Sequence, residues 1–304
     1  MTNPNEPSND LRMRAVLPAA PAVVHAALTD AAALRVWLAE YAEVALPDRY
    51  AFWGRYTPDG AEARQRVLHA GERDLRLAWT VGGVETTVEI TLTDGESDGA
   101  DGTVLALTQT DLPSFAEVLS DKAGPRGELQ TFWALAVANL ADYVAGRELT
   151  PRCDYTAPRM EAAVTIAAAP EAVFASLTEP AQFRRWFGAN VDIEPYVGGR
   201  FAMGGFELDP SGAKFVEFEP GRKATVRFAD GFLSSWELEG SDGGTRLTFV
   251  QSGFDAEHPP YAGWAGWLGG VSELRRYHEV PDWRTIWRLV EAPGIPAEMF
   301  SIDV

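Results

Sequence analysis

The sequence predicts an α+β protein made of two domains that share one plan. Its 304 residues suffice for two domains of about 150 residues, each able to bury a core. A helix-turn phrase occurs twice, as ALTDAAALRVWL at residues 27–38 and as SLTEPAQFRRWF at residues 176–187. Each phrase is followed by runs of alternating apolar and polar residues, and then by one long helical pattern. These observations indicate a tandem repeat.

Residue identities extend this repeat along the chain. When Pro21 is aligned with Pro170, the identities that follow keep their order, and their offset changes only across turn-rich gaps. That pattern is typical of a duplication followed by changes in loop length. The aligned pairs are Val24 and Val173, Ala26 and Ala175, Leu28 and Leu177, Thr29 and Thr178, Arg35 and Arg184, Trp37 and Trp186, Ala51 and Ala202, Thr103 and Thr245, Leu105 and Leu247, Gln109 and Gln251, Trp133 and Trp267, and Tyr143 and Tyr277.

Each copy begins with a strand and two short helices. The first strands are predicted over 12–17 and 162–167, where apolar and polar residues alternate. Pro21 and Pro170 follow closely, and proline suits the first turn of a helix because its fixed φ is helical and its missing N–H is not needed there. A second short helix then ends at the repeated tryptophan.

An antiparallel meander is predicted next. In the second copy the segments FVEF, ATVRFA, SSWELE and TRLTFVQS are separated by turn sequences such as EPG, ADG and GSDGG. Successive side chains on a strand point to opposite faces, so Trp236 and Leu238 are expected on the inner face and Glu237 and Glu239 in solvent. The same rule places Gln251 on the apolar side of its strand, as it does Gln109 in the first copy.

One long helix closes each copy, with apolar residues at helical spacing over 129–144 and 264–274. This gives an α+β plan in which a helix lies across a sheet. In the segment after Pro281, Trp283, Ile286, Trp287 and Val290 share one helical face. We predict a disordered tail at 1–10, a divergent first domain at 11–150, a second domain at 151–280 and a C-terminal extension at 281–304.

Charge and motifs exclude several classes of function. The net charge of −18 leaves no basic stripe to neutralise phosphates, which argues against nucleic acid and membrane partners. No apolar run approaches the roughly 20 residues of a spanning helix, and the single Cys153 with a polar N-terminus indicates a cytoplasmic protein. The sequence has no HExxH, clustered Cys/His, GxSxG or phosphate-binding loop, so neither a metal nor a cofactor is predicted.

The second copy resembles a known family. Its segments AAAPEAVFASLTEPAQFRRWFG, VGGRFAM, FVEFEPGRKATVRF, GGTRLTFVQSGF and GWAGWLGGVSEL occur in the order found in bacterial relatives of the heat-shock-protein-90 ATPase activator, a branch of the START-like SRPBCC superfamily. The resemblance covers residues 160–280. The first copy resembles the family in its first helix-turn and last helix but departs in the middle, where PDRYAFWGRY stands in place of GGRF.

The resemblance implies two helix-grip domains of START/Bet v type, each a curved antiparallel sheet wrapped around its long C-terminal helix. A cavity is expected between sheet and helix. The superfamily includes lipid and polyketide carriers, aromatic cyclases and many proteins with no known ligand. Because fold does not fix function, the function must be argued from the site.

Several residues are candidates for the wall of such a cavity. An inward glutamine must find partners, either in the protein or in a ligand, and large aromatic residues suit a core and a pocket equally well. Gly263, Gly266, Gly269 and Gly270 each cost roughly 1 kcal/mol of helix propensity, which suggests close approach by the sheet or by a ligand. The first copy has alanines there, so its cavity is expected to be filled. The ligand-binding candidates are Trp186, Phe201, Met203, Phe228, Trp236, Phe249, Gln251, Trp264, Trp267 and Gly270, with Trp37, Gln109 and Trp133 as first-domain equivalents.

These observations lead to three hypotheses about function. The first is binding of a small hydrophobic or aromatic ligand, mainly by the second domain. The second is a cofactor-free cyclase, dehydratase or hydrolase that uses Gln251 or one of the carboxylates Asp192, Glu207 and Glu217; the sequence identifies no catalytic residue and leaves enzymatic activity open. Activation of a chaperone ATPase ranks third, because the eukaryotic activators carry a different N-terminal domain. A homodimer is also left open.

Overall fold

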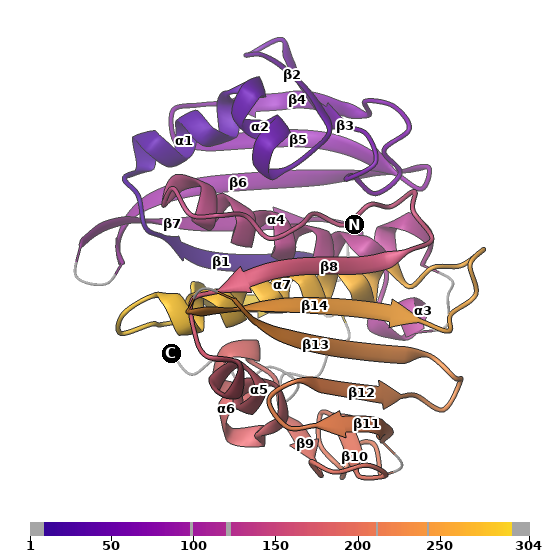
Figure 1. Ribbon diagram of the computed structural model, residues 1–304. Coiled ribbons are helices and arrows are strands. Elements are labelled where there is room, and N and C mark those ends of the chain that lie inside the picture. The colour runs from indigo at the N-terminus through magenta and orange to yellow at the C-terminus, as the bar shows by residue number, and fades with distance from the viewer. Residues whose placement is uncertain (1–8, 98–99, 120–122, 211, 242, 294–304) are drawn as a thin grey trace. The chain divides into compact units, whose positions relative to one another are not determined.

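The structure is a computed structural model that describes residues 9–293 apart from 98–99, 120–122, 211 and 242. Residues 1–8 of the expected tail and the chain beyond 293 lie outside the described residues. The chain divides into two compact units (Figure 1). Unit one runs to Thr156 and also includes the segment that begins at Ile286, and unit two comprises Ala157–Thr285.

Unit one contains a six-stranded antiparallel sheet, a separate two-stranded hairpin and a long helix. The sheet order is β15-β1-β7-β6-β5-β4, and the hairpin is β2-β3. The elements are β1 (Leu11–Leu17), α1 (Pro21–Thr29), α2 (Ala31–Trp37), β2 (Tyr41–Ala45), β3 (Arg49–Trp53), β4 (Gln65–Ala70), β5 (Asp74–Val81), β6 (Val84–Ser97), β7 (Ala100–Gln109), α3 (Phe115–Leu119), the 3-10 turn η1 (Gly124–Glu128), α4 (Leu129–Val144) and β15 (Trp287–Glu291).

Unit two contains a seven-stranded antiparallel sheet in the order β8-β14-β13-β12-β11-β10-β9. The long helix α7 runs along strands β8, β14 and β13 of this sheet (Figure 1). The elements are β8 (Met160–Ile166), α5 (Pro170–Thr178), α6 (Pro180–Phe187), β9 (Val191–Ile193), β10 (Arg200–Met203), β11 (Ala213–Glu219), β12 (Lys223–Arg227), β13 (Leu233–Ser241), β14 (Gly244–Ser252) and α7 (Tyr261–Glu279).

Both units have the predicted α+β plan, in which one long helix covers an antiparallel sheet. Strand alternation decides which side chains form the core. On β13 Trp236 and Leu238 are buried while Glu237 and Glu239 are exposed, as predicted. Gln109 on β7 and Gln251 on β14 are also buried, so each sheet has a polar amide on its inner face.

The repeated helix-turn phrase has the same hydrogen bonds in both units. The indole Nε1 of Trp37 donates to the Ala27 carbonyl oxygen at 3.1 Å, and that of Trp186 donates to the Ser176 carbonyl oxygen at 2.8 Å. Each bond ties the second short helix to the end of the first. Because Trp37 and Trp186 are only 1% and 2% exposed, the bond also satisfies an indole N–H that has lost its water.

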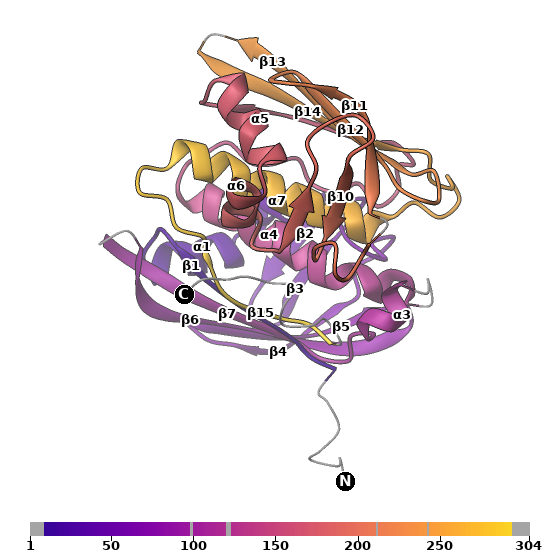
Figure 2. The same ribbon diagram turned by 90° about the horizontal axis from the view of Figure 1, so that it is seen from below.

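The C-terminal segment forms a strand, so the helical face predicted for it is wrong. Residues 287–291 pair antiparallel with β1 as the sixth strand of the sheet in unit one, with Val290 opposite Met13 (Figure 2). Just before the strand, the Ile286 carbonyl oxygen accepts from the Val16 N–H at 2.7 Å, and the Ile286 side chain is 7% exposed in the core of unit one. The backbone groups of the β1 edge favour strand pairing over a short isolated helix.

We predict that Ile286→Ala destabilises unit one. Shortening a buried isoleucine costs about 2–5 kcal/mol through lost burial and the cavity left behind, and Ile286 lies in the core although it follows unit two in sequence. Urea unfolding followed by far-UV circular dichroism measures the change. Glu291→Ala, which changes an exposed residue at the end of the strand that follows Ile286, serves as the control and should change the free energy of unfolding by less than about 0.5 kcal/mol. The placement of Ile286 in the core of unit one would be contradicted if both variants were equally stable. It would also be contradicted if a chain truncated after Val280 were as stable as the wild type.

A half-buried carboxyl group, that of Glu128, lies at the start of α4. Burial, with a smaller contribution from the negative charge of Asp59, raises the pKa of Glu128 from 4.5 to about 8. The folded protein therefore holds a proton between pH 4.5 and 8 that the unfolded chain has released. Unfolding is thus favoured as the pH rises through this window.

We therefore predict that the free energy of unfolding falls as the pH rises from about 4.5 to about 8, and that Glu128→Gln makes this decline smaller. The glutamine is neutral at every pH and removes the proton from the equilibrium. Urea unfolding at pH 5, 7 and 9 measures the slope. Glu62→Gln, which changes a mostly exposed carboxylate, is the control and should leave the slope as it is. A Glu128→Gln profile identical to that of the wild type would refute the prediction.

Candidate functional site

Aromatic rings from β13, β14 and α7 meet on the inner side of the sheet in unit two. The ring of Phe249 stacks on Trp236 at a centroid distance of 5.6 Å and on Trp264 at 5.0 Å. Trp267 contacts Trp236 at 5.4 Å and Phe249 at 5.6 Å. The structure thus brings together these four candidates, which we call the inner aromatic cluster.

Helix α6 and strand β10 extend this cluster. Phe201 on β10 lies 6.2 Å from Trp236, and Phe187 on α6 lies 5.1 Å from Trp267, between ring centroids. A Cβ atom added to Gly270 would lie 2.6 Å from a ring carbon of Phe187. The group that approaches the α7 backbone at Gly270 is therefore an aromatic side chain of α6, and neither the sheet nor a ligand is needed to explain this glycine.

Two further candidates lie at other places in unit two. Met203 is half-buried at the end of β10, where it pairs with Val191 of β9. Phe228 is half-buried just after β12 and contacts Phe232 at a centroid distance of 5.2 Å, in a small group of rings separate from the inner aromatic cluster. Phe228 is thus not brought to the same site as Trp236 and Gln251.

Gln251 is buried with half of its amide unpaired. Its side chain is 4% exposed, and its Nε2 donates to Ser234 Oγ at 3.1 Å. Its Oε1 is buried without a partner in the described chain, and so is the indole Nε1 of Trp236. A buried polar group left without a hydrogen bond costs about 1–3 kcal/mol. Sequence reasoning missed Ser234, although strand alternation from Trp236 already places it on the inner face.

The equivalent glutamine of unit one has both of its amide groups satisfied. Gln109 Oε1 accepts from Trp133 Nε1 of α4 at 2.6 Å, and Gln109 Nε2 donates to Thr86 Oγ1 at 2.9 Å. Trp267 is aligned with Trp133, yet it makes ring contacts and leaves the Gln251 oxygen unpaired. The two units therefore differ at the same position of the same strand.

The long helices also differ in the side chains that face the sheet. Trp133 is 2% exposed in unit one, whereas Trp267 is half-buried in unit two. Phe132 contacts Trp79 at 5.7 Å and Phe52 at 6.5 Å, so its ring fills the space under α4. A Cβ atom added to Gly263 of α7 would meet nothing within 4 Å. With Trp133 aligned to Trp267, the residues Leu129, Phe132 and Ala136 of α4 correspond to Gly263, Gly266 and Gly270 of α7.

The three candidate carboxylates lie outside the inner aromatic cluster. Glu217 is exposed, accepts from Thr225 Oγ1 at 2.7 Å and pairs with Lys223 at 3.0 Å, and these bonds lower its pKa. Asp192 accepts from the Phe206 N–H at 2.9 Å and pairs with Arg184 at 3.3 Å. Glu207 is exposed. Each of the three therefore has a solvent or surface role in this structure, and none supplies an acid or base to the cluster.

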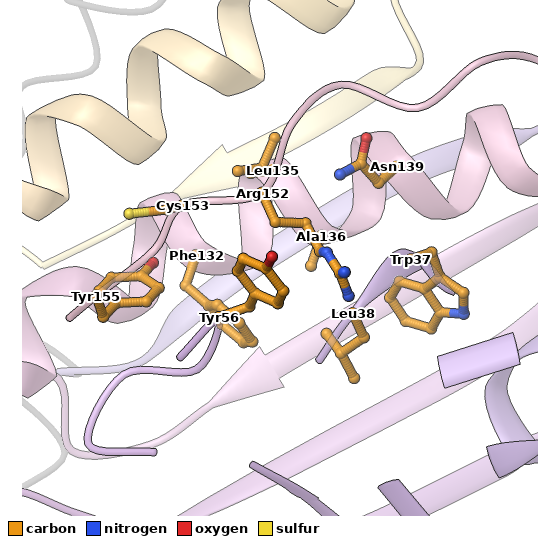
Figure 3. A pocket seen from close by; sticks show the side chains of 10 residues that line it. All are labelled: Trp37, Leu38, Tyr56, Phe132, Leu135, Ala136, Asn139, Arg152, Cys153 and Tyr155. Atoms are coloured by element: carbon orange, nitrogen blue, oxygen red, sulfur yellow. The ribbon is translucent and has the colours of Figure 1, made fainter. Parts of the chain in front are cut away.

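Unit one has a small pocket between α4, the end of α2 and the segment at 152–155 (Figure 3). Arg152 lies over the Tyr56 ring at 4.0 Å and donates to the Ala39 carbonyl oxygen at 2.7 Å. The space in which the centre of a water molecule fits is about 10 Å³, which is room for roughly one water molecule. Its lining residues are Trp37, Leu38, Tyr56, Phe132, Leu135, Ala136, Asn139, Arg152, Cys153 and Tyr155.

In the part of the chain that the structure describes, no group of three or more His, Cys, Asp or Glu residues is placed to hold a metal ion. Within the same residues, every helix is too short or too polar to span a bilayer.

Several known structures are similar to parts of the chain or to most of it. The Aha1 dimer from Colwellia psychrerythraea is 19% identical over 40% of this chain and 96% of its own, with a TM-score of 0.35. A protein from Chromobacterium violaceum is 21% identical over 40% of this chain and 99% of its own, with a TM-score of 0.33. DynU16, from the dynemicin biosynthetic locus, is 19% identical over 90% of this chain and 100% of its own, with a TM-score of 0.35. These values say nothing about activity.

Comparison with family models gives a match in unit two. The model described as Activator of Hsp90 ATPase homolog 1-like protein matches residues 167–278, from the end of β8 to the last turn of α7. A comparison with curated proteins found no match. The second half of the chain therefore carries a domain of the Activator of Hsp90 ATPase homolog 1-like family.

Proposed function

We propose that unit two binds a small hydrophobic or aromatic ligand against the inner aromatic cluster, beside α7. The observation that carries this proposal is the difference between the two long helices. Where α4 places Phe132 in the core, α7 has Gly266, and the neighbouring Trp267 is left half-buried.

Aromatic stacking suits this ligand class. Flat rings gain from offset or edge-to-face contact with tryptophan and phenylalanine, and the cluster presents both arrangements. A ligand with two fused rings that buries about 200 Å² of apolar surface gains about 5 kcal/mol, at 25 cal/mol for each Å². The loss of translational and rotational freedom on association offsets part of this gain.

We predict that Gly266→Phe weakens binding of 2-methylnaphthalene at least tenfold. The new ring copies Phe132 of unit one and takes the space that the ligand needs. Isothermal titration calorimetry measures the affinity, and quenching of tryptophan fluorescence provides a second readout.

The matched control for this experiment is Gly263→Ala. It changes another glycine of α7, but its added methyl group meets open space, and alanine is the better helix former. Its affinity for 2-methylnaphthalene should equal that of the wild type. The proposal fails if the wild type shows no binding, or if Gly266→Phe binds as well as Gly263→Ala does.

A further inference from the structure

Among the buried polar atoms of unit two that have no hydrogen-bond partner in the described chain, two belong to the inner face of the sheet. They are the amide oxygen of Gln251 and the indole N–H of Trp236. We propose that they select a neutral ligand that carries a hydroxyl group on a flat aromatic frame, as a phenol or naphthol does. This inference rests on the proposed function and adds the polar part of the ligand to it.

The two atoms lie on neighbouring positions of one surface. On β13 and β14, Trp236 is opposite Phe249 and Ser234 is opposite Gln251. Trp236 and Gln251 are therefore diagonal neighbours on one face, where Cβ atoms are about 7–8 Å apart or slightly less. The stacked rings of Phe249 and Trp264 lie beside them. A ligand held by these rings has its edge close to both polar atoms.

The polarity of the two atoms defines the functional group. Gln251 Oε1 can only accept a hydrogen bond, and Trp236 Nε1 can only donate one. A hydroxyl group does both, since it has one donor and two acceptor lone pairs. An ether could serve only Trp236, and a hydrocarbon could serve neither. The pair therefore favours a hydroxyl group over both alternatives.

Unit one shows the same position without this selectivity. There the indole Nε1 of Trp133 donates a hydrogen bond to Gln109 Oε1 at 2.6 Å, so this oxygen is already paired within the protein. In unit two Trp267 contacts Trp236 and Phe249 through its ring, and the Gln251 oxygen stays open. The hydrogen bond that completes the core in one unit is thus available for recognition in the other.

Charge argues for a neutral ligand. The residues that surround Gln251 and Trp236 on the inner face are Ser234, Phe249, Trp264 and Trp267, which carry no charge. The whole chain has a net charge of −18, which repels anions. A buried carboxylate would lose its hydration without gaining a cation, so a hydroxyl group fits this place and a carboxylate does not.

The test compares three probes that differ in one group: 2-naphthol, 2-methoxynaphthalene and 2-methylnaphthalene. Titration calorimetry at pH 7 on the full chain should show 2-naphthol bound at least tenfold more tightly than 2-methylnaphthalene, with 2-methoxynaphthalene between them. In Gln251→Met, which keeps the volume and removes the acceptor, 2-naphthol should lose this tenfold advantage while 2-methylnaphthalene binds as before. In Trp236→Phe, the advantage of 2-methoxynaphthalene should disappear.

Thr248→Val is the matched control, because Thr248 lies on the same strand as Gln251 and points to the opposite face. It should keep the wild-type order of affinities. Circular dichroism confirms that each variant is folded, and Trp236→Phe tests the same site independently if Gln251→Met does not fold. Equal affinity of the wild type for all three probes would overturn the hydroxyl selectivity and leave the proposed function standing. Absence of binding by every probe would overturn both.

Discussion

Each unit depends on one constraint: a single long helix must cover the apolar inner face of an antiparallel sheet. Strand alternation brings Trp236, Leu238 and Phe249 to that face in unit two, and a half-exposed apolar face of this kind is unstable in water. The two short helices of each unit are held together by the hydrogen bonds of Trp37 and Trp186. The side chains of the long helix then decide how closely the space between helix and sheet is filled.

The hydrogen bonds of the inner-face glutamine differ between the two units. Gln109 is satisfied on both sides because Trp133 approaches it from α4, in a core that also holds Phe132 and Trp79. Gln251 keeps the same strand position and the same burial, but its oxygen is unpaired. A buried amide oxygen without a hydrogen bond lowers the stability of the folded protein. If stability alone were selected, a substitution that replaces the glutamine would be favoured. The open oxygen is therefore understood more readily as part of a recognition site than as part of a core.

Much of this architecture could be predicted from the sequence, because the deciding interactions are local or periodic. Alternation placed Trp236 and Gln251 inside, and the proline-started helices, the meander and the closing helix follow from spacing. The features that could not be predicted depend on contacts with residues far away in the sequence. The segment around Ile286 has helical spacing but becomes a strand because the edge of β1 offers it backbone hydrogen bonds. Gly270 marked a close approach, yet only the structure identifies Phe187 as the group that approaches.

The two units differ in how completely the polar groups of their cores are satisfied. Unit one has the filled core, and it takes the chain segment after α7 as a sixth strand, with Ile286 buried in its core. Its stability therefore depends on residues encoded after unit two. Unit two has Gly266 in place of a core phenylalanine, and the amide oxygen of its inner-face glutamine has no partner in the described chain. A binding site needs such local deficits because a ligand must find both space and unsatisfied groups. The inner-face glutamine of unit one has both of its amide groups satisfied, so substitutions of Gln109 should affect folding and leave ligand selectivity unchanged.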